Sequence, residues 1–306
     1  MTDTVTDPTT TVTAPAATLR AAIDAVTLAA STDPARPALT AVQLDRDPDG
    51  ALRLTATDSY RLHTARVPAD LPADTPPVLV SAAALAALAR KVAPARRLYG
   101  TLPVSIGAGY GSPADHRKAG VTVAGQHLPG IDGDFPNWRA LFPADAATVW
   151  SPPGSITARL DAGVRAVRGR IAATVYAALA TRPGGFTAKD AEQAGKTARN
   201  TMVGVIIDGI PPTATVTLRA IKANGYGFEP LPNIDPLTLP DAGALEGDLS
   251  ALPVAFNPGY LADGLAAVPG AWVQGNTALK PWILLPGGVT DLATADVAAL
   301  LMPVRL

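Results

Sequence analysis

The sequence predicts an α+β fold in which the order β-α-β-β-β recurs along two domains. Three observations support this prediction. The chain has 306 residues, which is enough for two domains with separate cores. Apolar residues recur at helical spacing in a few segments, and short runs rich in β-branched residues lie between them. The same order of elements occurs twice in the first half of the chain and again, with looser spacing, in the second half.

The first predicted domain covers residues 9–146 and follows a flexible N-terminal tail at 1–8. Its first repeat starts with a strand at 9–13. The helix that follows has an apolar face formed by Leu19, Ile23, Val26 and Ala30. Strands are expected at 39–44, 51–57 and 61–67. The Asp-Pro-Asp-Gly sequence at 47–50 has the residues of a hairpin turn.

The second repeat starts with a strand at 78–80, and Ser81 is the expected N-cap of a helix. Leu85, Leu88 and Val92 form the apolar face of this helix. The strands that complete the repeat are expected at 103–106, 120–123 and 126–128.

The second predicted domain covers residues 147–306. A helical stripe is formed by Ile156, Leu160, Val164, Val167 and Ile171. A second helix is expected after Phe256 and Asn257. Strands are expected at 203–207, at 215–221, near Trp272, at 282–285 and at 298–304. The Pro- and Gly-rich segments 209–213 and 225–240 are expected to be loops, and the hydrophilic stretch 182–199 an insertion or a helix extension.

Composition excludes several classes of function. The chain has no cysteine, which rules out disulfides, thiolate catalysis and cysteine zinc sites. His63, His116 and His127 lack ligand spacing and are expected to be ordinary surface or edge residues. No apolar run reaches the roughly 18 residues that would span a bilayer. The polar, acidic N-terminus does not resemble a signal peptide, so we expect a cytoplasmic protein that contacts no membrane.

No segment predicts catalysis. The Gly-rich run 107–112 lacks the Gly-Lys-Ser/Thr ending of a phosphate loop and is better explained as a hairpin connection. Asp58 lies far in sequence from any other carboxylate that it might act with, and we expect it to bond to nearby backbone amides in a turn. Because no nucleophile, base and acid form a set, we expect neither enzyme activity nor a cofactor or metal ion.

Four short segments, in order along the chain, resemble the bacterial β sliding clamp, the DNA polymerase III beta subunit family. They are Thr57-Asp-Ser-Tyr-Arg-Leu62, Gly133-Asp-Phe-Pro-Asn-Trp-Arg139, Phe256-Asn-Pro-Gly-Tyr-Leu-Ala-Asp263 and the apolar terminus Leu300-Leu-Met-Pro-Val-Arg-Leu306. The resemblance covers the family's middle and C-terminal domains only. It implies the DNA clamp fold, with helices lining a ring bore and sheets outside.

The resemblance also implies a cleft that binds short linear motifs of client proteins. Carried over by position, the cleft residues are Leu39, Thr57, Ser59, Tyr60, Arg61, Leu62, Pro136, Leu141, Asn257, Tyr260, Leu279, Pro281, Leu301, Met302, Pro303, Val304 and Arg305. An apolar groove with a few polar groups suits a peptide, and methionine suits a pocket with several ligands. Ala140 stands where the family commonly has a basic residue. The alternative is that these residues are core at a domain junction.

Basic residues on helices are candidates for contact with DNA. Helical geometry places Arg165 opposite the apolar stripe of its helix, and Arg159, Arg168 and Arg170 flank that stripe. Arg90 and Lys91 point away from the core, and Arg20 is a weaker candidate on the first helix. Alone, this pattern is equally typical of a solvated face. The resemblance favours contact with duplex phosphates, which would be sequence-independent and sensitive to salt.

The family's clamps have three domains per chain and close as dimers of six domains, whereas this sequence matches two. Three copies would supply six domains, so a homotrimer with C3 symmetry is expected. Expected partners are duplex DNA, a polymerase and a clamp loader ATPase. Two alternatives remain: an open adaptor or competitor that binds clamp-interacting peptides, and an enzyme or accessory factor that uses the 182–199 insertion. Composition favours a GC-rich genome, and the short form favours a phage.

Overall fold

The protein is described from a computed structural model, which covers residues 10–93, 100–107, 120–142, 146–181, 187–223 and 228–305. The chain forms two compact units. The first comprises Met1–Leu141 and Asp291–Leu300, and the second Phe142–Thr290 and Leu301–Leu306. The tail 1–8, residues 108–112 of the Gly-rich run, His116 and residues 182–186 of the insertion lie outside the described residues.

The first unit contains the predicted order β-α-β-β-β twice. The first repeat consists of β1 (Thr10–Pro15), α1 (Ala16–Thr27), β2 (Ala41–Arg46), β3 (Leu52–Thr57) and β4 (Arg61–Val67), with the short 3-10 helix η1 (Pro37–Thr40) before β2. The second consists of β5 (Val78–Ser81), α2 (Ala82–Val92), β6 (Thr101–Gly107), β7 (Gly120–Val123) and β8 (Gln126–Pro129), followed by η2 (Arg139–Leu141).

The two repeats exchange their first strands. One sheet has the order β1-β6-β7-β8. In the other, the strands of the first unit are ordered β18-β4-β3-β2-β5, where β18 is Val297–Leu301. β1 pairs with β6, and β5 pairs with β2, both antiparallel. Each sheet therefore depends on both repeats, which ties them into one core.

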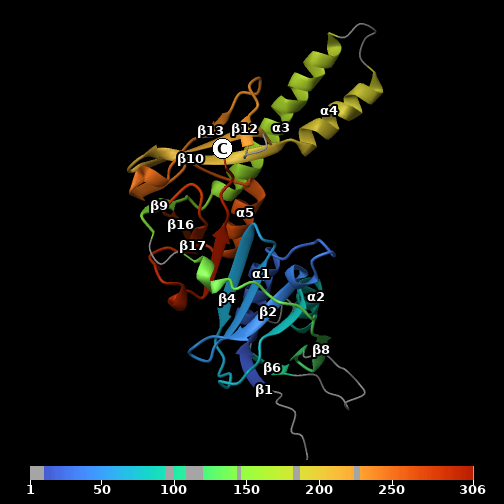
Figure 1. Ribbon diagram of the computed structural model, residues 1–306, viewed down its shortest axis with the longest axis vertical. Helices are drawn as coiled ribbons and strands as arrows, with labels where there is room; N and C mark the ends of the chain where they lie inside the picture. Colours follow the sequence, from blue (N-terminus) through green and yellow to red (C-terminus); the bar gives the residue numbers. More distant parts are fainter. Residues whose placement is uncertain are drawn as a thin grey trace, which may run out of the picture. The chain divides into compact units, whose positions relative to one another are not determined.

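Helices α1 and α2 close this core, and Figure 1 shows them beside the strands of the first unit. Most of their predicted apolar residues are buried, with Leu19, Ile23 and Leu85 each at most 2% exposed, whereas Val92 is half-buried and Ala30 lies beyond the end of α1. Ser81 caps α2 as predicted, because its Oγ accepts a hydrogen bond from the backbone N–H of Ala84 at 3.3 Å.

The second unit follows the same order with an inserted helix. Its first repeat contains β9 (Thr148–Ser151), α3 (Ile156–Ala180), α4 (Ala188–Asn200), β10 (Met202–Ile210), β11 (Thr213–Ala223), β12 (Phe228–Pro230), β13 (Leu237–Leu239) and β14 (Ala244–Gly247). Then come η3 (Leu249–Ala251), β15 (Val254–Phe256), α5 (Pro258–Ala267), β16 (Ala271–Gly275) and β17 (Trp282–Pro286). The chain then returns to the first unit with η4 (Leu292–Thr294) and β18. The strands are ordered β15-β10-β11-β14-β9-β16-β17, with β12 and β13 also paired to β11.

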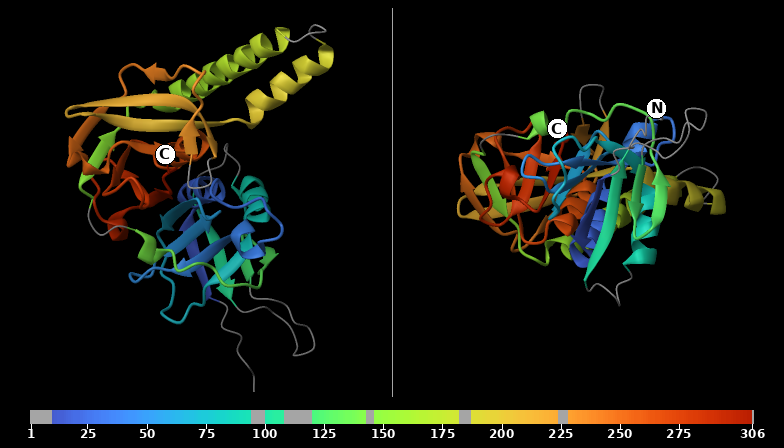
Figure 2. Two further views of the ribbon diagram at one scale, coloured as in Figure 1. Left: turned by 45° about the horizontal axis from the view of Figure 1, so that its top comes forward. Right: turned by 90° about the horizontal axis from the view of Figure 1, so that it is seen from below.

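The insertion forms a helical pair. α3 continues beyond its predicted stripe to Ala180, and α4 runs back beside it, as both Figure 1 and Figure 2 show. A capping box starts α4, in which Thr187 and Asp190 each accept a bond from the other's backbone N–H. Because α3 ends at Ala180, the stretch 182–199 does not continue that helix, and residues 188–199 instead belong to the separate helix α4.

Three expectations about local structure are wrong. β18 ends at Leu301 rather than at Val304. The segments 209–213 and 225–240 were expected to be loops, but the first contains the end of β10 and the start of β11, and the second contains β12 and β13, which pair with the long β11. His63 is not a surface residue: it is fully buried on β4, and its Nδ1 lies 2.8 Å from the carbonyl oxygen of Ala25.

No helix in the described ranges is long and apolar enough to cross a membrane.

Candidate peptide and DNA interfaces

The turn between β3 and β4 is held rigidly by its own side chains. The Asp58 carboxylate accepts hydrogen bonds from the backbone N–H groups of Tyr60 and Arg61 at 2.9 and 3.0 Å, and from Arg61 Nε at 3.1 Å. Thr57 Oγ1 donates to the Arg61 carbonyl at 2.6 Å. The predicted turn role of Asp58 is confirmed. Ser59 has a positive φ of 81°, and the Tyr60 side chain is 59% exposed.

The predicted cleft residues Leu39, Thr57 and Leu62 lie near this turn. Leu39 lies half-buried on η1, and Arg36 from the same segment donates through Nη1 to Ser59 Oγ at 3.4 Å. The structure thus brings η1 and the turn together. Thr57 and Leu62 are buried in the first unit, 6% and 1% exposed, so they pack beneath the surface of the predicted cleft and do not form that surface.

The segment after β8 presents Pro136 and Leu141 on the surface of the first unit. Trp138 fixes this segment, since it is 3% exposed and its Nε1 donates to Gln43 Oε1 at 3.2 Å. The Arg139 guanidinium lies 4.3 Å from the Trp138 ring centre, a cation–π contact. With this anchor in place, Pro136 is exposed and Leu141 is 48% exposed.

Arg139 also belongs to an ionic network that we did not predict. The Asp47 carboxylate, on a residue 5% exposed, lies 2.5 Å from Arg53 Nη2, 3.2 Å from Arg139 Nη2 and 4.0 Å from Arg66 Nε. The register of β3 and β4 places Arg53 directly opposite Arg66. Like charges in opposite positions repel, so Asp47 compensates a pair that would otherwise be unfavourable.

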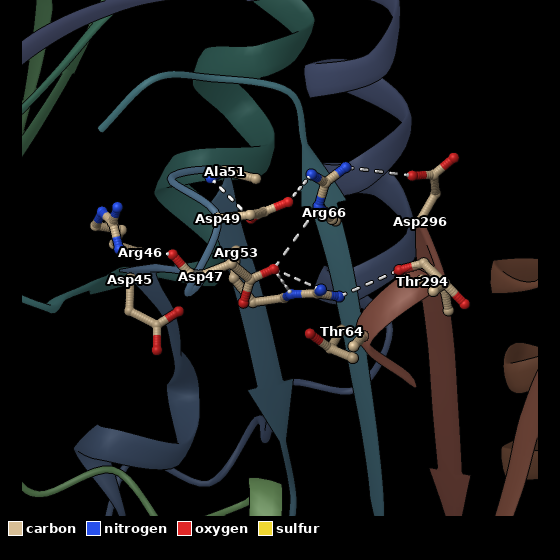
Figure 3. A network of polar contacts seen from close by, with 12 residues as sticks. Asp45, Arg46, Asp47, Asp49, Ala51, Arg53, Thr64, Arg66, Thr294 and Asp296 are labelled. Carbon is tan, nitrogen blue, oxygen red and sulfur yellow. Dashed lines mark hydrogen bonds and ion pairs between the residues drawn. The ribbon is translucent and has the colours of Figure 1, made fainter. Parts of the chain in front are cut away.

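Figure 3 shows how the network reaches the last part of the first unit. Arg66 bonds to Asp49 on the hairpin, and its Nη1 lies 3.8 Å from the carboxylate of Asp296. Arg53 Nη1 donates to the Ala295 carbonyl at 3.4 Å, and the backbone N–H of Arg66 donates to the Asp296 carbonyl at 2.6 Å. The arginines of β3 and β4 therefore fix the segment that leads into β18.

The pKa values of two carboxyl groups in this region are shifted in opposite directions. Burial raises the pKa of Asp45, against the hydrogen bond from Arg139 Nη1 to its Oδ2 at 2.9 Å. Asp45 Oδ1 is buried and has no hydrogen-bond partner among the described residues. The hydrogen bond from Arg66 lowers the pKa of Asp49 on the exposed hairpin.

In the second unit, an aromatic contact brings two predicted segments together. Phe256 and Trp282 pack edge to face with ring centres 5.8 Å apart. Asn257 follows Phe256 and caps α5, since its Oδ1 accepts from the backbone N–H groups of Gly259 and Tyr260 at 2.9 and 3.3 Å. Tyr260 is half-buried on the first turn of α5.

The turn before β17 is also fixed. Thr277 Oγ1 accepts from the backbone N–H groups of Leu279 and Lys280 at 3.2 and 3.1 Å, and Trp282 Nε1 donates to the Thr277 carbonyl at 2.9 Å. As a result Leu279 is 60% exposed, and Pro281 is half-buried beside it.

The C-terminal residues 302–305 bond to β15 and β12 of the second unit. The backbone N–H of Val304 donates to the Ala255 carbonyl at 2.7 Å, and that of Phe228 donates to the Arg305 carbonyl at 2.8 Å. Leu301 is buried, whereas Met302 is 37% exposed. Pro303 and Val304 are half-buried and Arg305 is exposed. The C-terminal residues 302–305 and the residues around Asn257 therefore form one surface of the second unit.

Exposed apolar side chains concentrate on the predicted cleft residues. Among the described residues, the large hydrophobic side chains classed as exposed are Leu28, Tyr60, Leu141, Tyr176, Ile210, Leu279 and Met302. Tyr60 and Leu141 are predicted cleft residues of the first unit, and Leu279 and Met302 of the second. Exposed apolar groups on rigid turns are typical of a binding surface.

The basic candidates for DNA contact divide into two groups. Four of them already bind protein groups: Arg20 to the Ala93 carbonyl and to Asp24, Lys91 to Gln126, Arg159 to the Asp241 carbonyl, and Arg170 to the carbonyls of Asp235 and Pro236. Arg90, Arg165 and Arg168 are exposed, with no hydrogen-bond or ion-pair partner within the described ranges. These three are the best placed to bind phosphates.

The described residues contain no group of three or more His, Asp or Glu side chains that could hold a metal ion.

The ionic network was missed because Asp47 occurs in a turn sequence and was assigned to the turn alone. The alternation of Asp45, Asp47 and Asp49 with Arg46 and Arg53 was the available signal.

Residues 13–137 match the family model of the DNA polymerase III beta subunit, central domain. No curated protein matches the chain by sequence. A Bacillus subtilis DNA polymerase sliding clamp is 20% identical, with a TM-score of 0.63 over 97% of this chain and 64% of that one. This chain thus spans less than two thirds of the length of that clamp.

Two further structures are similar. The Caulobacter crescentus clamp, with polyethylene glycol at its beta-motif tethering region, is 18% identical, with a TM-score of 0.65 over 100% of this chain and 68% of that one. A Pseudomonas aeruginosa clamp bound to griselimycin is 18% identical, with a TM-score of 0.63 over 100% and 68%. The resemblance seen in four sequence segments is confirmed: residues 13–137 match the central domain of the DNA polymerase III beta subunit, and the chain has the fold of the bacterial beta sliding clamps.

Proposed function

We propose that this chain is a DNA sliding clamp, a processivity factor that encircles duplex DNA and tethers a replicative polymerase through short linear motifs. The observation that carries the proposal is the set of exposed apolar side chains at predicted cleft positions: Tyr60 and Leu141 on one unit, and Leu279 and Met302 on the other. These are residues that the family resemblance assigns to the peptide cleft. A clamp function requires no catalytic group and no cofactor.

The peptide would be bound mainly by apolar contact. Tyr60 and Leu279 sit on turns whose backbones are fixed by Asp58 and Thr277, so little conformational entropy is lost when they bind a peptide. Met302 provides an adaptable surface for several client sequences. Tethering then raises the effective concentration of polymerase at the primer end.

DNA contact would be non-specific. Arg90, Arg165 and Arg168 are on helices and exposed, and such groups bind phosphates through charge alone. A ring that slides needs contacts of this kind, because base-specific bonds would hold it in place. A clamp loader ATPase would open the ring, in the cytoplasm where replication takes place.

We further propose a homotrimer, since three two-unit chains supply six domains. β8 ends its sheet in the described part of the chain, with Gln126 and His127 exposed, and β13 has β11 as its only strand partner there. Two such edges suit head-to-tail pairing between copies, which closes by rotation.

Topological retention on DNA tests this function. The chain is loaded with a clamp loader onto a nicked circular plasmid, and the complex is passed through a gel-filtration column in high salt. We expect the protein to elute with the circular DNA and to be lost after the plasmid is cut once. Equal loss from circular and linear DNA would contradict encirclement.

A second function is favoured by one observation. Four of the basic candidates are tied to protein groups, which leaves a sparse set of free cations on the described helices. An open adaptor or competitor that binds clamp-interacting peptides would need the cleft alone. It would bind client peptides with normal affinity but show no retention on circular DNA.

A further inference from the structure

The second unit contains a groove that belongs to neither interface described above. It has a volume of about 820 Å³ and lies between α3, α4, the end of β11 and the segment around β12. None of its lining residues is a predicted cleft or DNA-binding residue. The groove exists because α3 extends to Ala180 and α4 returns to β10, the part of the chain that departs from the expected pattern.

The floor of the groove is apolar and incompletely covered. Val175, Met202, Phe228, Leu231 and Ile234 line it, and each is only half-buried. The reason is the composition of α4, whose buried residues are two alanines, Ala194 and Ala198. Such small side chains leave the larger groups of the opposite side without a full packing partner.

The polar residues of the groove are suited to a peptide backbone. Gln193, Asn200 and Asn233 line it with side-chain amides that have no hydrogen-bond partner among the described residues. An amide both donates and accepts, as a peptide backbone requires. Together with the apolar floor, these groups form the combination that is typical of a binding site, and the volume lies within the roughly 300–1,000 Å³ of such sites.

The charged residues of the groove indicate which kind of peptide it would bind. Its charged lining residues are Lys196 from α4 and Lys222 from β11, and no carboxylate lines it. Each lysine pairs with a glutamate, Glu192 at 2.8 Å and Glu229 at 2.9 Å. Both lysine side chains are 55% exposed, and exposed pairs are weak, so a carboxylate on a ligand can replace the glutamate.

We propose that this groove binds a short segment of a partner protein that carries two or more large apolar side chains flanked by aspartate or glutamate. The apolar side chains occupy the floor over Met202 and Phe228, the amides bind the backbone, and the carboxylates reach Lys196 and Lys222. The site shares no lining residue with the predicted cleft, although the backbone N–H of Phe228 donates to the carbonyl of the cleft residue Arg305.

A displayed library of random ten-residue peptides tests the proposal. It is selected in parallel on the full chain and on the variant Lys196→Glu/Lys222→Glu. Peptides enriched on the natural chain alone are expected to combine Leu, Phe or Met with Asp or Glu. Their affinity, measured by fluorescence anisotropy, should fall at least tenfold in the double variant. Lys189→Glu, an exposed change on the same helix outside the groove, should leave the affinity unchanged.

Methionine methyl NMR locates the bound peptide. The chain has three methionines, Met1, Met202 and Met302, so one labelled spectrum reports on the groove and the cleft separately. A selected peptide should shift the Met202 signal and leave Met302 in place. The proposal is overturned if no acidic apolar peptide is enriched, if Lys189→Glu weakens binding as much as the double variant, or if only Met302 shifts.

Discussion

The two units of this protein use charged residues differently. In the first, Asp47 is 5% exposed and is surrounded by Arg53, Arg66 and Arg139. In the second, Lys196 and Lys222 pair with glutamates at the surface, where both lysine side chains are 55% exposed. Buried charges must keep their partners, whereas exposed charges can exchange them. The network around Asp47 therefore stabilises the fold of the first unit, whereas Lys196 and Lys222 of the second unit can exchange their partners for a ligand.

The largest effect should come from breaking the buried network. Asp47→Ala leaves Arg53 and Arg66 opposite each other without the carboxylate between them, and removing one partner of a buried pair costs about 3–5 kcal/mol. Urea unfolding followed by circular dichroism measures the change. The matched variant Glu192→Ala, which removes an exposed partner in the second unit, should cost less than about 1 kcal/mol. Equal losses would contradict the contrast between the units.

A smaller effect is expected from the cleft surfaces. Tyr60→Ala and Met302→Ala should each weaken a labelled clamp-motif peptide about tenfold to a hundredfold, since truncating an anchor side chain typically costs about 1.4–3 kcal/mol. Fluorescence anisotropy measures the affinity. Tyr176→Ala removes another exposed tyrosine, 38% exposed and outside the cleft, and should have no effect. Unchanged affinity in both cleft variants would remove the cleft from the account.

The basic helix face should show a weaker, salt-dependent effect. Arg165→Gln/Arg168→Gln should reduce the slope of log affinity against log salt by about 2, because each phosphate contact contributes roughly 0.9. Binding to a duplex is measured at several salt concentrations. Lys280→Gln, an exposed cation on a turn, should change the slope little. An unaltered slope in the arginine variant would show that α3 does not meet DNA.

The smallest effect concerns pH. Burial raises the pKa of Asp45, so its proton favours the folded state at low pH, and this contribution is lost as pH rises through its folded pKa. Arg66 lowers the pKa of Asp49, so that contribution is present above the ordinary pKa and is lost as pH falls through the folded value.

Urea midpoints between acid and neutral pH separate these two groups. Relative to the natural chain, Asp45→Asn should gain stability as pH rises, and Asp49→Asn should lose it. Slopes of the same sign in both variants would contradict the opposite roles assigned to the two carboxyl groups.

Much of the fold could be predicted because its repeats are local patterns. The stripe from Ile156 to Ile171, the Ser81 cap and the Asp58 turn depend on residues close in sequence. The α4 helix was missed although Thr187 and Asp190 form a capping box, since its composition is polar and only two alanines are buried. β12 and β13 form only because β11 is long enough to pair with them.

The cleft assignment stays a prediction. Tyr60 and Met302 belong to the short segments that carry the resemblance, Leu279 was carried over by position, and all three side chains are exposed. The network around Asp47 was not predicted, because it joins residues from the hairpin, β3, β4 and the segment after β8. Such contacts depend on tertiary arrangement, and the run of charges at 45–53 does not by itself show which partners they meet.

The most direct test of the sliding-clamp account is the absolute mass in solution, measured by light scattering over a concentration series. The account predicts a trimer, about three times the 31.2 kDa of one chain, that persists on dilution. A monomer at every concentration would contradict a closed ring of this chain.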